Sequence, residues 1–174
     1  ALQQKQFVSS VSDSDVDVVA VAQEGGLVAV NLTMIRGGQH VGDKTIYPQQ
    51  ATLDEDGDVA DVLLAFCAHH YIDRAVPPVI LVNMDFDRGP LSEVLSAQRG
   101  SAVQIQSNTI GDRRVWVNMA EQNVKLAIAQ KLSHAATQDA RLAALVEALD
   151  LPADTKRIEC FDISHTQGEA TVAS

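Results

Sequence analysis

The hydrophobic pattern between residues 16 and 47 predicts three consecutive β-strands. Residues 16–21 are rich in valine and end before a turn at residues 23–26, and residues 27–36 partly alternate apolar and polar side chains. A second glycine pair, residues 37–38, precedes a third predicted strand at residues 40–47. Because tight turns join neighbouring strands in antiparallel pairs, we expect an antiparallel three-stranded meander.

The pattern then changes to a helical period. Residues 52–71 begin with hydroxyl and acidic side chains and continue with apolar residues at helical spacing, which predicts a helix. Pro77-Pro78 would stop that helix, and the apolar run at residues 79–82 predicts a strand buried on both faces. The remaining predicted elements are a helix at residues 90–98, a strand at residues 102–106, and a helix at residues 114–149 with a break around residues 133–137.

The order of these elements, β-β-β-α-β-α-β-α, predicts an α/β fold of the ribonuclease H-like type for residues 13–150. Leu151-Pro152 ends the last helix. Beyond it we expect one strand at residues 157–163 and another after a turn around Gly168. Residues 151–174 are therefore predicted to be a linker and the first strands of a second domain.

Composition and charge narrow the classes of protein that fit this pattern. The chain has 174 residues, of which 46% are hydrophobic and 4% aromatic, so we expect a folded domain with an aliphatic core. Its 13 basic and 23 acidic residues give a net charge of −10, which argues against a simple electrostatic binder of nucleic acid. Isolated Cys67 and Cys160 indicate reduced thiols in a cytoplasmic protein. No apolar run approaches the roughly 18 residues of a membrane span.

Basic residues concentrate at the start of the last predicted helix. Arg113 and Arg114 are adjacent there, with Lys125 and Lys131 further along. Such a group could contact a DNA backbone or an acidic partner protein, or it could be a solvated helix face. Both interpretations stay open.

Four acidic residues of the predicted domain form one candidate metal site: Asp17, Asp85, Asp87 and Glu121. A ribonuclease H-like site takes carboxylates from comparable elements, and a divalent metal held there would support phosphodiester hydrolysis. However, Asp17 lies at the beginning of a strand, and residues 85–89 are typical of a turn before a helix. We therefore favour a degenerate, non-catalytic scaffold and keep a metal-dependent nuclease within this domain as the alternative.

Asp162 is a second candidate, because it lies between apolar neighbours in a predicted strand. A carboxylate in such a place is costly to bury unless it is paired or binds a cation. Metal-dependent phosphodiester hydrolysis needs such carboxylates. A capping or salt-bridging role at the strand end fits equally well from the residues alone.

The segment Phe161-Asp162-Ile163-Ser164-His165-Thr166-Gln167-Gly168 resembles the start of the C-terminal endonuclease domain of the bacterial excinucleases of the UvrC family. Three earlier segments resemble the central region of the same family in the same order. They are Ile35-Arg36-Gly37-Gly38, Gly111-Asp112-Arg113-Arg114 and Met119-Ala120-Glu121-Gln122-Asn123. The resemblance thus extends over nearly the whole chain.

The resemblance implies a subunit that incises damaged double-stranded DNA on both sides of a lesion in nucleotide excision repair, with UvrB as its partner. It implies that residues 1–12 end a UvrB-binding helical segment, that residues 13–150 are the central domain, and that residues 156–174 begin the nuclease that makes the 5′ incision. Asp162 matches the first carboxylate of an Asp-Asp-His catalytic set and is implied to be a ligand of Mg²⁺ or Mn²⁺. Because the other two members would follow Ser174, we expect this chain alone to cut no DNA.

Overall fold

The computed structural model describes residues 15–48, 58–159, 163–166 and 170–173. The predicted UvrB-binding segment at residues 1–12 lies outside them. The chain divides into two compact units, one up to Leu132 and one from Ser133 onward. Each is described by itself below.

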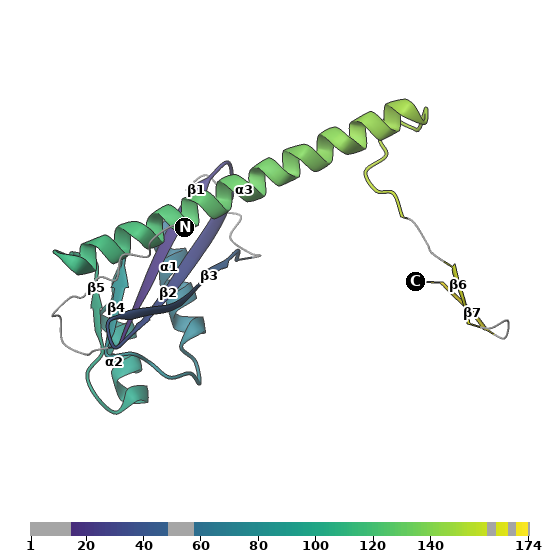
Figure 1. The fold of residues 1–174 in the computed structure, drawn as a ribbon. Helices are drawn as coiled ribbons and strands as arrows, with labels where there is room; N and C mark the ends of the chain where they lie inside the picture. The colour runs from purple at the N-terminus through teal and green to yellow at the C-terminus, as the bar shows by residue number, and fades with distance from the viewer. Residues whose placement is uncertain (1–14, 49–57, 160–162, 167–169, 174) are drawn as a thin grey trace, which may run out of the picture. The chain divides into compact units, whose positions relative to one another are not determined.

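A five-stranded sheet organises the first unit (Figure 1). Its strands are β1 (Val16–Glu24), β2 (Leu27–Arg36), β3 (Gln39–Ile46), β4 (Val79–Val82) and β5 (Gln104–Gln106), in the spatial order β3-β2-β1-β4-β5. β1, β2 and β3 pair antiparallel, whereas β4 is parallel to β1 and β5 is parallel to β4. This arrangement confirms the predicted meander and the ribonuclease H-like order of elements.

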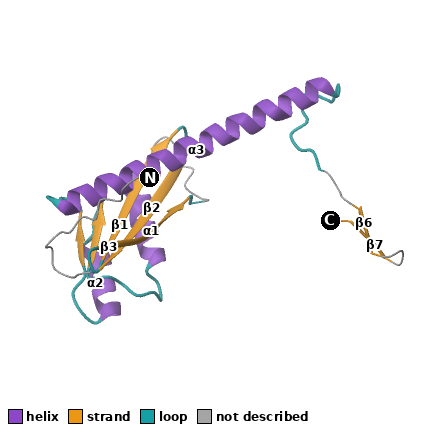
Figure 2. Ribbon diagram, in the orientation of Figure 1, coloured by secondary structure: helices purple, strands orange, loops and turns teal. Residues whose placement is uncertain are grey.

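Helices cover both faces of the sheet (Figure 2). On one face, α1 (Val59–His70) and α2 (Gly89–Arg99) pack through side chains that include Leu63, Cys67 and Leu95. On the other, α3 (Asp112–Ala148) packs through four buried residues, Val117, Ala120, Val124 and Ile128. β1 supplies both cores in alternation, with Val19 and Val21 on the first face and Val18 and Ala20 on the second.

The beginnings of two helices differ from their predictions. α1 follows Asp58, whose side chain accepts a hydrogen bond of 2.8 Å from the Ala60 amide and so caps the helix. The predicted start at residues 52–56 lies outside the described residues. α3 begins at Asp112, two residues before the predicted start at residue 114.

The predicted break in the last helix, around residues 133–137, is wrong. α3 is continuous from Asp112 to Ala148, because no glycine or proline interrupts it. The Thr137 hydroxyl donates a hydrogen bond of 2.9 Å to the Ser133 carbonyl. The polar side chain that suggested a break is thus satisfied within the helix.

α3 ends in a Schellman motif within the second unit. The Leu151 amide donates to the Val146 carbonyl at 3.0 Å, and the Asp150 amide donates to the Glu147 carbonyl at 3.3 Å. Asp150 takes the left-handed conformation, with φ of 50°, that this motif requires at the residue beyond the helix. The chain is thereby turned away from the helix just before Pro152.

The last described segments are two strands, β6 (Ile163–Thr166) and β7 (Ala170–Ala173), which pair antiparallel. β7 confirms the predicted second strand, whereas the predicted turn around Gly168 lies outside the described residues. The predicted first strand started too early, because residues 157–159 are not in a strand. The described pairs run from Ile163 opposite Ala173 to Thr166 opposite Ala170.

No helix of the described residues is long and apolar enough to cross a membrane.

Because the two sides of α3 differ in burial, truncating a residue on each side is expected to change stability by very different amounts. Ile128 is fully buried against the sheet, whereas Leu126 is 61% exposed. Ile128→Ala is expected to lower the free energy of unfolding by about 2–5 kcal/mol, because it leaves a cavity in the core. Leu126→Ala is expected to change it by less than about 0.5 kcal/mol. Urea unfolding followed by circular dichroism measures both, and equal losses would contradict the packing of α3.

Candidate functional site

Asp17 is a buried carboxylate in β1, with its residue 3% exposed. It lies beside Met34 of β2 and Ile80 of β4. One carboxylate oxygen accepts a hydrogen bond of 2.7 Å from the Arg36 guanidinium, and the other accepts one of 2.8 Å from the Tyr71 hydroxyl. Both oxygens are therefore engaged by protein groups.

Arg36 places the compensating charge at the end of β2. The same guanidinium nitrogen that contacts Asp17 also lies 3.2 Å from the Val16 carbonyl and 2.8 Å from the Ile35 carbonyl. A buried carboxylate is tolerated when it is paired and hydrogen-bonded in this way. Asp17, Arg36 and Tyr71 form what we call the Asp17 cluster, which joins β1, β2 and the end of α1.

Two titratable groups that feel the charge of Asp17, Tyr71 directly after α1 and Cys67 within it, are held protonated. Burial raises the pKa of the Tyr71 hydroxyl well above 10, and the negative charge of Asp17 raises it further. Burial, followed by the charge of Asp17, raises the pKa of the Cys67 thiol to about 12. Tyr71 therefore stays a hydrogen-bond donor, and Cys67 is not a thiolate nucleophile at neutral pH.

The carboxyl ends of the parallel strands are a common place for an active site in an α/β sheet. Here Asn83, directly after β4, lies at that edge and bonds to the backbone of β1. The Val21 amide donates to the Asn83 side-chain oxygen at 3.0 Å, and the Asn83 side-chain nitrogen donates to the Val21 carbonyl at 2.9 Å. The Asn83 side chain thus extends the pairing of β4 with β1. It is a neutral amide, so it brings no negative charge to this edge of the sheet.

Asp85 lies in the exposed loop between β4 and α2. One of its oxygens accepts a hydrogen bond from the Ser107 hydroxyl at 3.2 Å and one from the Phe86 amide at 3.2 Å. The same oxygen is 3.4 Å from the Arg88 guanidinium. These contacts tie the loop after β4 to the loop after β5, and Asp87 is exposed beside them.

The prediction that the fold brings Asp17, Asp85, Asp87 and Glu121 together is wrong. Asp17 bonds to Tyr71 at the end of α1, on one face of the sheet, whereas Glu121 belongs to α3 on the other face. Glu121 pairs with Lys125 one turn along that helix, at 2.6 Å. Asp85 follows the carboxyl end of β4, away from the Asp17 position. In the described part of the chain, no group of three His, Cys, Asp or Glu residues could hold a metal ion.

The predicted basic group is divided among different contacts. Arg113 is half-buried and donates a hydrogen bond of 2.9 Å to the side-chain oxygen of Gln106 in β5. Lys131 lies 3.7 Å from the centre of the Tyr47 ring, a cation–π contact, and Lys125 pairs with Glu121. Arg114 is exposed at the start of α3. The group is therefore not one continuous basic surface.

Asp162, the candidate metal ligand near the C-terminus, lies outside the described residues. The strand β6 begins at the next residue, Ile163, and the backbone of His165 pairs with Thr171. The role of Asp162 stays a prediction.

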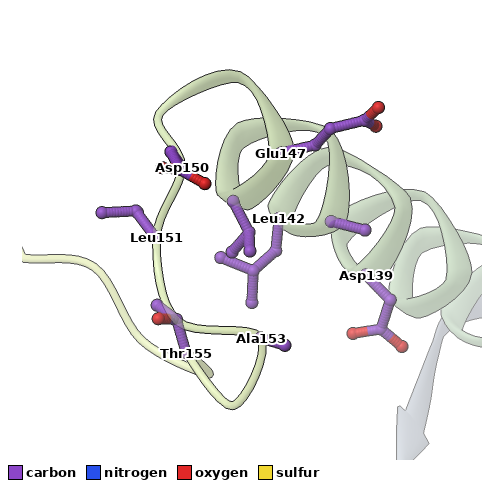
Figure 3. Close-up of a pocket in the computed structure, with 9 residues that line it drawn as sticks. Asp139, Leu142, Glu147, Asp150, Leu151, Ala153 and Thr155 are labelled. Carbon is purple, nitrogen blue, oxygen red and sulfur yellow. The ribbon is translucent and has the colours of Figure 1, made fainter.

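A pocket of about 460 Å³ lies between the end of α3 and the loop that follows it. Leu142, Val146 and Leu151 give it apolar walls, and Asp139, Glu147 and Asp150 also line it. Figure 3 shows the carboxylates of Asp139 and Glu147 pointing away from each other. The acidic side chains therefore do not converge as metal ligands do.

Sequence reasoning missed the partners of Asp17 and the role of Asn83. One signal was available: Tyr71 is four residues after Cys67 on the apolar face of a predicted helix, and a buried tyrosine hydroxyl needs a hydrogen-bond partner. The identity of that partner depends on how α1 packs on β1, which the pattern does not give. Nothing in the sequence marked Asn83.

The raised pKa of Cys67 predicts that the chain loses stability in alkaline solution. Above pH 9 the thiol ionises in the unfolded chain but stays protonated in the folded one, where its pKa is about 12. The stability contributed by the protonated thiol is complete below pH 9 and is lost as the pH rises toward 12. Tyr71 adds a loss that begins near pH 10.

Denaturant midpoints measured between pH 8 and pH 11 test this expectation. Cys67→Ala is expected to lower stability at every pH, because it leaves a cavity, but to make the alkaline decline shallower. The informative quantity is the slope of the denaturant midpoint against pH. An unchanged slope in Cys67→Ala would show that the thiol ionises equally in both states.

Comparison with known proteins agrees with this fold and extends it. A family model described as the UvrC Ribonuclease H-like domain matches residues 15–131, and one described as the UvrC RNAse H endonuclease domain matches residues 146–174. UvrABC system protein C of Methylobacillus flagellatus is 49% identical over 173 residues. The proteins of the same name from Nitrosomonas europaea and Neisseria meningitidis are 49% and 41% identical.

Each of these alignments covers 99% of this chain but 28% of the relative. The chain therefore spans little more than a quarter of the length of the relatives it matches. The first family model alone covers most of the chain, and the structure has the order of elements predicted for a ribonuclease H-like domain. The chain belongs to the UvrC family.

Proposed function

We propose that this chain is part of a DNA endonuclease that incises damaged double-stranded DNA on both sides of a lesion, with UvrB as its partner. Residues 15–131 are a non-catalytic scaffold domain within it. The names of the relatives and of the second family model support the endonuclease assignment. We also propose a cytoplasmic location for the whole protein, in keeping with the free, buried thiol of Cys67.

The burial and pairing of the Asp17 side chain are the observation that best supports the scaffold role. Asp17 is 3% exposed, its charge is already paired with Arg36, and each of its oxygens accepts a hydrogen bond. In the described residues it is not part of any group of three His, Cys, Asp or Glu residues that could hold a metal ion. At the edge of the sheet where the parallel strands end, the Asn83 amide bonds to Val21, and the Asp85 carboxylate bonds to Phe86, Ser107 and Arg88. Together these features favour a structural role for the domain.

The catalytic chemistry is assigned to the next domain, which begins near the C-terminus of this chain. There Asp162 would supply one carboxylate to a bound Mg²⁺ or Mn²⁺, as the family resemblance implies. Carboxylate oxygens suit both ions, but a single carboxylate does not complete an octahedral site. When bound, such an ion would stabilise negative charge on the oxygens of the phosphodiester. The remaining ligands would come from other residues of the polypeptide.

An incision assay tests this assignment. The 174-residue chain, supplied with Mn²⁺, UvrB and a lesion-bearing duplex, is expected to make no cut. In the complete gene product, Asp162→Asn is expected to lower 5′ incision by at least about 100-fold, because the substitution removes a metal ligand. Incision on the 3′ side should continue.

Asp85→Asn in the same gene product is the matched control. It makes the same chemical change at a carboxylate that bonds only loop residues, so both incisions are expected at normal rates. If Asp85→Asn abolished an incision, the scaffold role would be wrong. If Asp162→Asn left 5′ incision intact, the metal assignment would be wrong.

A second candidate function is contact with a DNA backbone or an acidic partner surface through the start of α3. Arg114 is exposed there, and Arg113 lies beside it with its side chain bonded to Gln106. Because the chain as a whole carries a net charge of −10, such a contact would be local and would supplement binding by other parts of the protein.

Arg114→Glu is expected to leave the fold intact and to weaken binding of the gene product with UvrB to lesion-bearing DNA. If Arg114 contacts a phosphate, the slope of log affinity against log salt should fall by about 1. Arg141→Glu, the same charge change at another exposed position of α3, is the control. Equal salt slopes in the two variants would exclude a phosphate contact at Arg114.

A further inference from the structure

The side of α3 that faces away from the sheet carries a second row of apolar side chains. Val115, Met119 and Leu126 are 51%, 36% and 61% exposed. Their spacing of four and seven residues places them within about 40° of one another around the helix axis. We call this row the outer ridge of α3.

The outer ridge has no part in the core of its own unit. The buried side of α3, which includes Val124 and Ile128, already packs on the sheet. Single exposed apolar residues are ordinary on a protein surface, but a row of large ones along a helix indicates an interaction surface.

The rim of the outer ridge is mostly polar and uncharged. Asn118, Gln122 and Gln130 are exposed on the same side of the helix. Lys125 borders this side, about 20° from Asn118 around the helix axis, and its ammonium group pairs with Glu121 at 2.6 Å. Because that charge is paired, the surface gives little electrostatic attraction to nucleic acid or to a charged peptide. Depletion of charge around apolar residues, with polar amides at the rim, is typical of the centre of a protein–protein interface.

The size of the outer ridge limits which proteins it can hold. From Val115 to Leu126 it is about 16 Å long, or three helical turns, a length that matches one packed helix. Stable complexes of separate molecules use about 20–30 residues on each side, many more than this ridge provides. A segment of the same polypeptide needs less, because the chain that connects it keeps its effective concentration near the millimolar range.

We propose that the outer ridge is the docking site for an uncharged, apolar helix face from another segment of the same polypeptide. The relatives leave ample length for such a segment, since this chain covers 28% of the Methylobacillus flagellatus protein and 29% of the one from Dechloromonas aromatica. The inference goes beyond the proposed function, and it would stand even if residues 15–131 were found to cut DNA.

Site-specific photo-crosslinking in the complete gene product tests the docking site. A benzophenone amino acid in place of Leu126 is expected to crosslink to a segment outside residues 15–148, within a product of monomer mass. The same amino acid in place of Tyr47 is the positive control, because the Tyr47 hydroxyl bonds to the Ala127 carbonyl of α3 at 3.0 Å. Crosslinks of dimer mass, crosslinks to UvrB alone, or no crosslink while the control succeeds would each overturn the proposal.

Charge insertion gives a second measurement. Leu126→Lys is expected to lower the melting temperature of the complete gene product, or of the transition that contains this domain, by several degrees. The 174-residue chain should melt as before with the same substitution. Val94→Lys introduces the same charge at a 62% exposed position on α2 and should change neither protein. Equal responses to the two substitutions would also overturn the proposal.

Discussion

The burial of β1 on both faces is the constraint on which the rest of the first unit depends. Residues 16–22 of this strand are all buried, so apolar side chains leave the sheet in both directions. Each face therefore needs its own cover, and α1 and α2 provide one while α3 provides the other. The parallel pairing of β4 and the antiparallel pairing of β2 complete the hydrogen bonds of β1 along both of its edges.

The same constraint explains the role of Asp17. A carboxylate on a strand that is buried on both faces destabilises the fold unless it is paired with another group inside the protein. Arg36 and Tyr71 are that partner set, and both oxygens of Asp17 are occupied by them. The guanidinium of Arg36 thus supplies the positive charge that makes the buried carboxylate tolerable.

α3 combines two separate tasks along one helix. Its buried side, centred on Val124, closes the second core, whereas its outer ridge carries apolar residues that the unit itself does not use. The helix then continues without interruption through residues 133–137 and ends at the Schellman motif around Asp150. The helix is continuous because α3 contains no glycine or proline, and the polar residues between 133 and 137 do not interrupt it.

Much of the fold could be predicted because its determinants are local. Valine-rich runs between glycine pairs produce the meander, and the apolar run at residues 79–82 produces a strand buried on both faces. The first strand near the C-terminus was placed too early, at residue 157, because strand limits depend on a pairing partner as well as on the apolar pattern. The candidate acidic site failed for a related reason. Position along the chain shows that Asp17 and Glu121 belong to the right kinds of element, but not that the sheet stands between them.

The sequence by itself determined the order of elements, the aliphatic core and the family resemblance, because each rests on residue type and spacing. Only the tertiary structure decided what each polar side chain contacts. Asp17 contacts Arg36 from β2 and Tyr71 directly after α1, and Asn83 contacts the backbone of Val21, across separations of 19, 54 and 62 residues. The Arg36 contact follows from the register of the β1–β2 hairpin, which the turn at Gly25–Gly26 sets. The contacts of Tyr71 and Asn83 depend on how α1 and β4 pack against β1, and no local pattern encodes that packing.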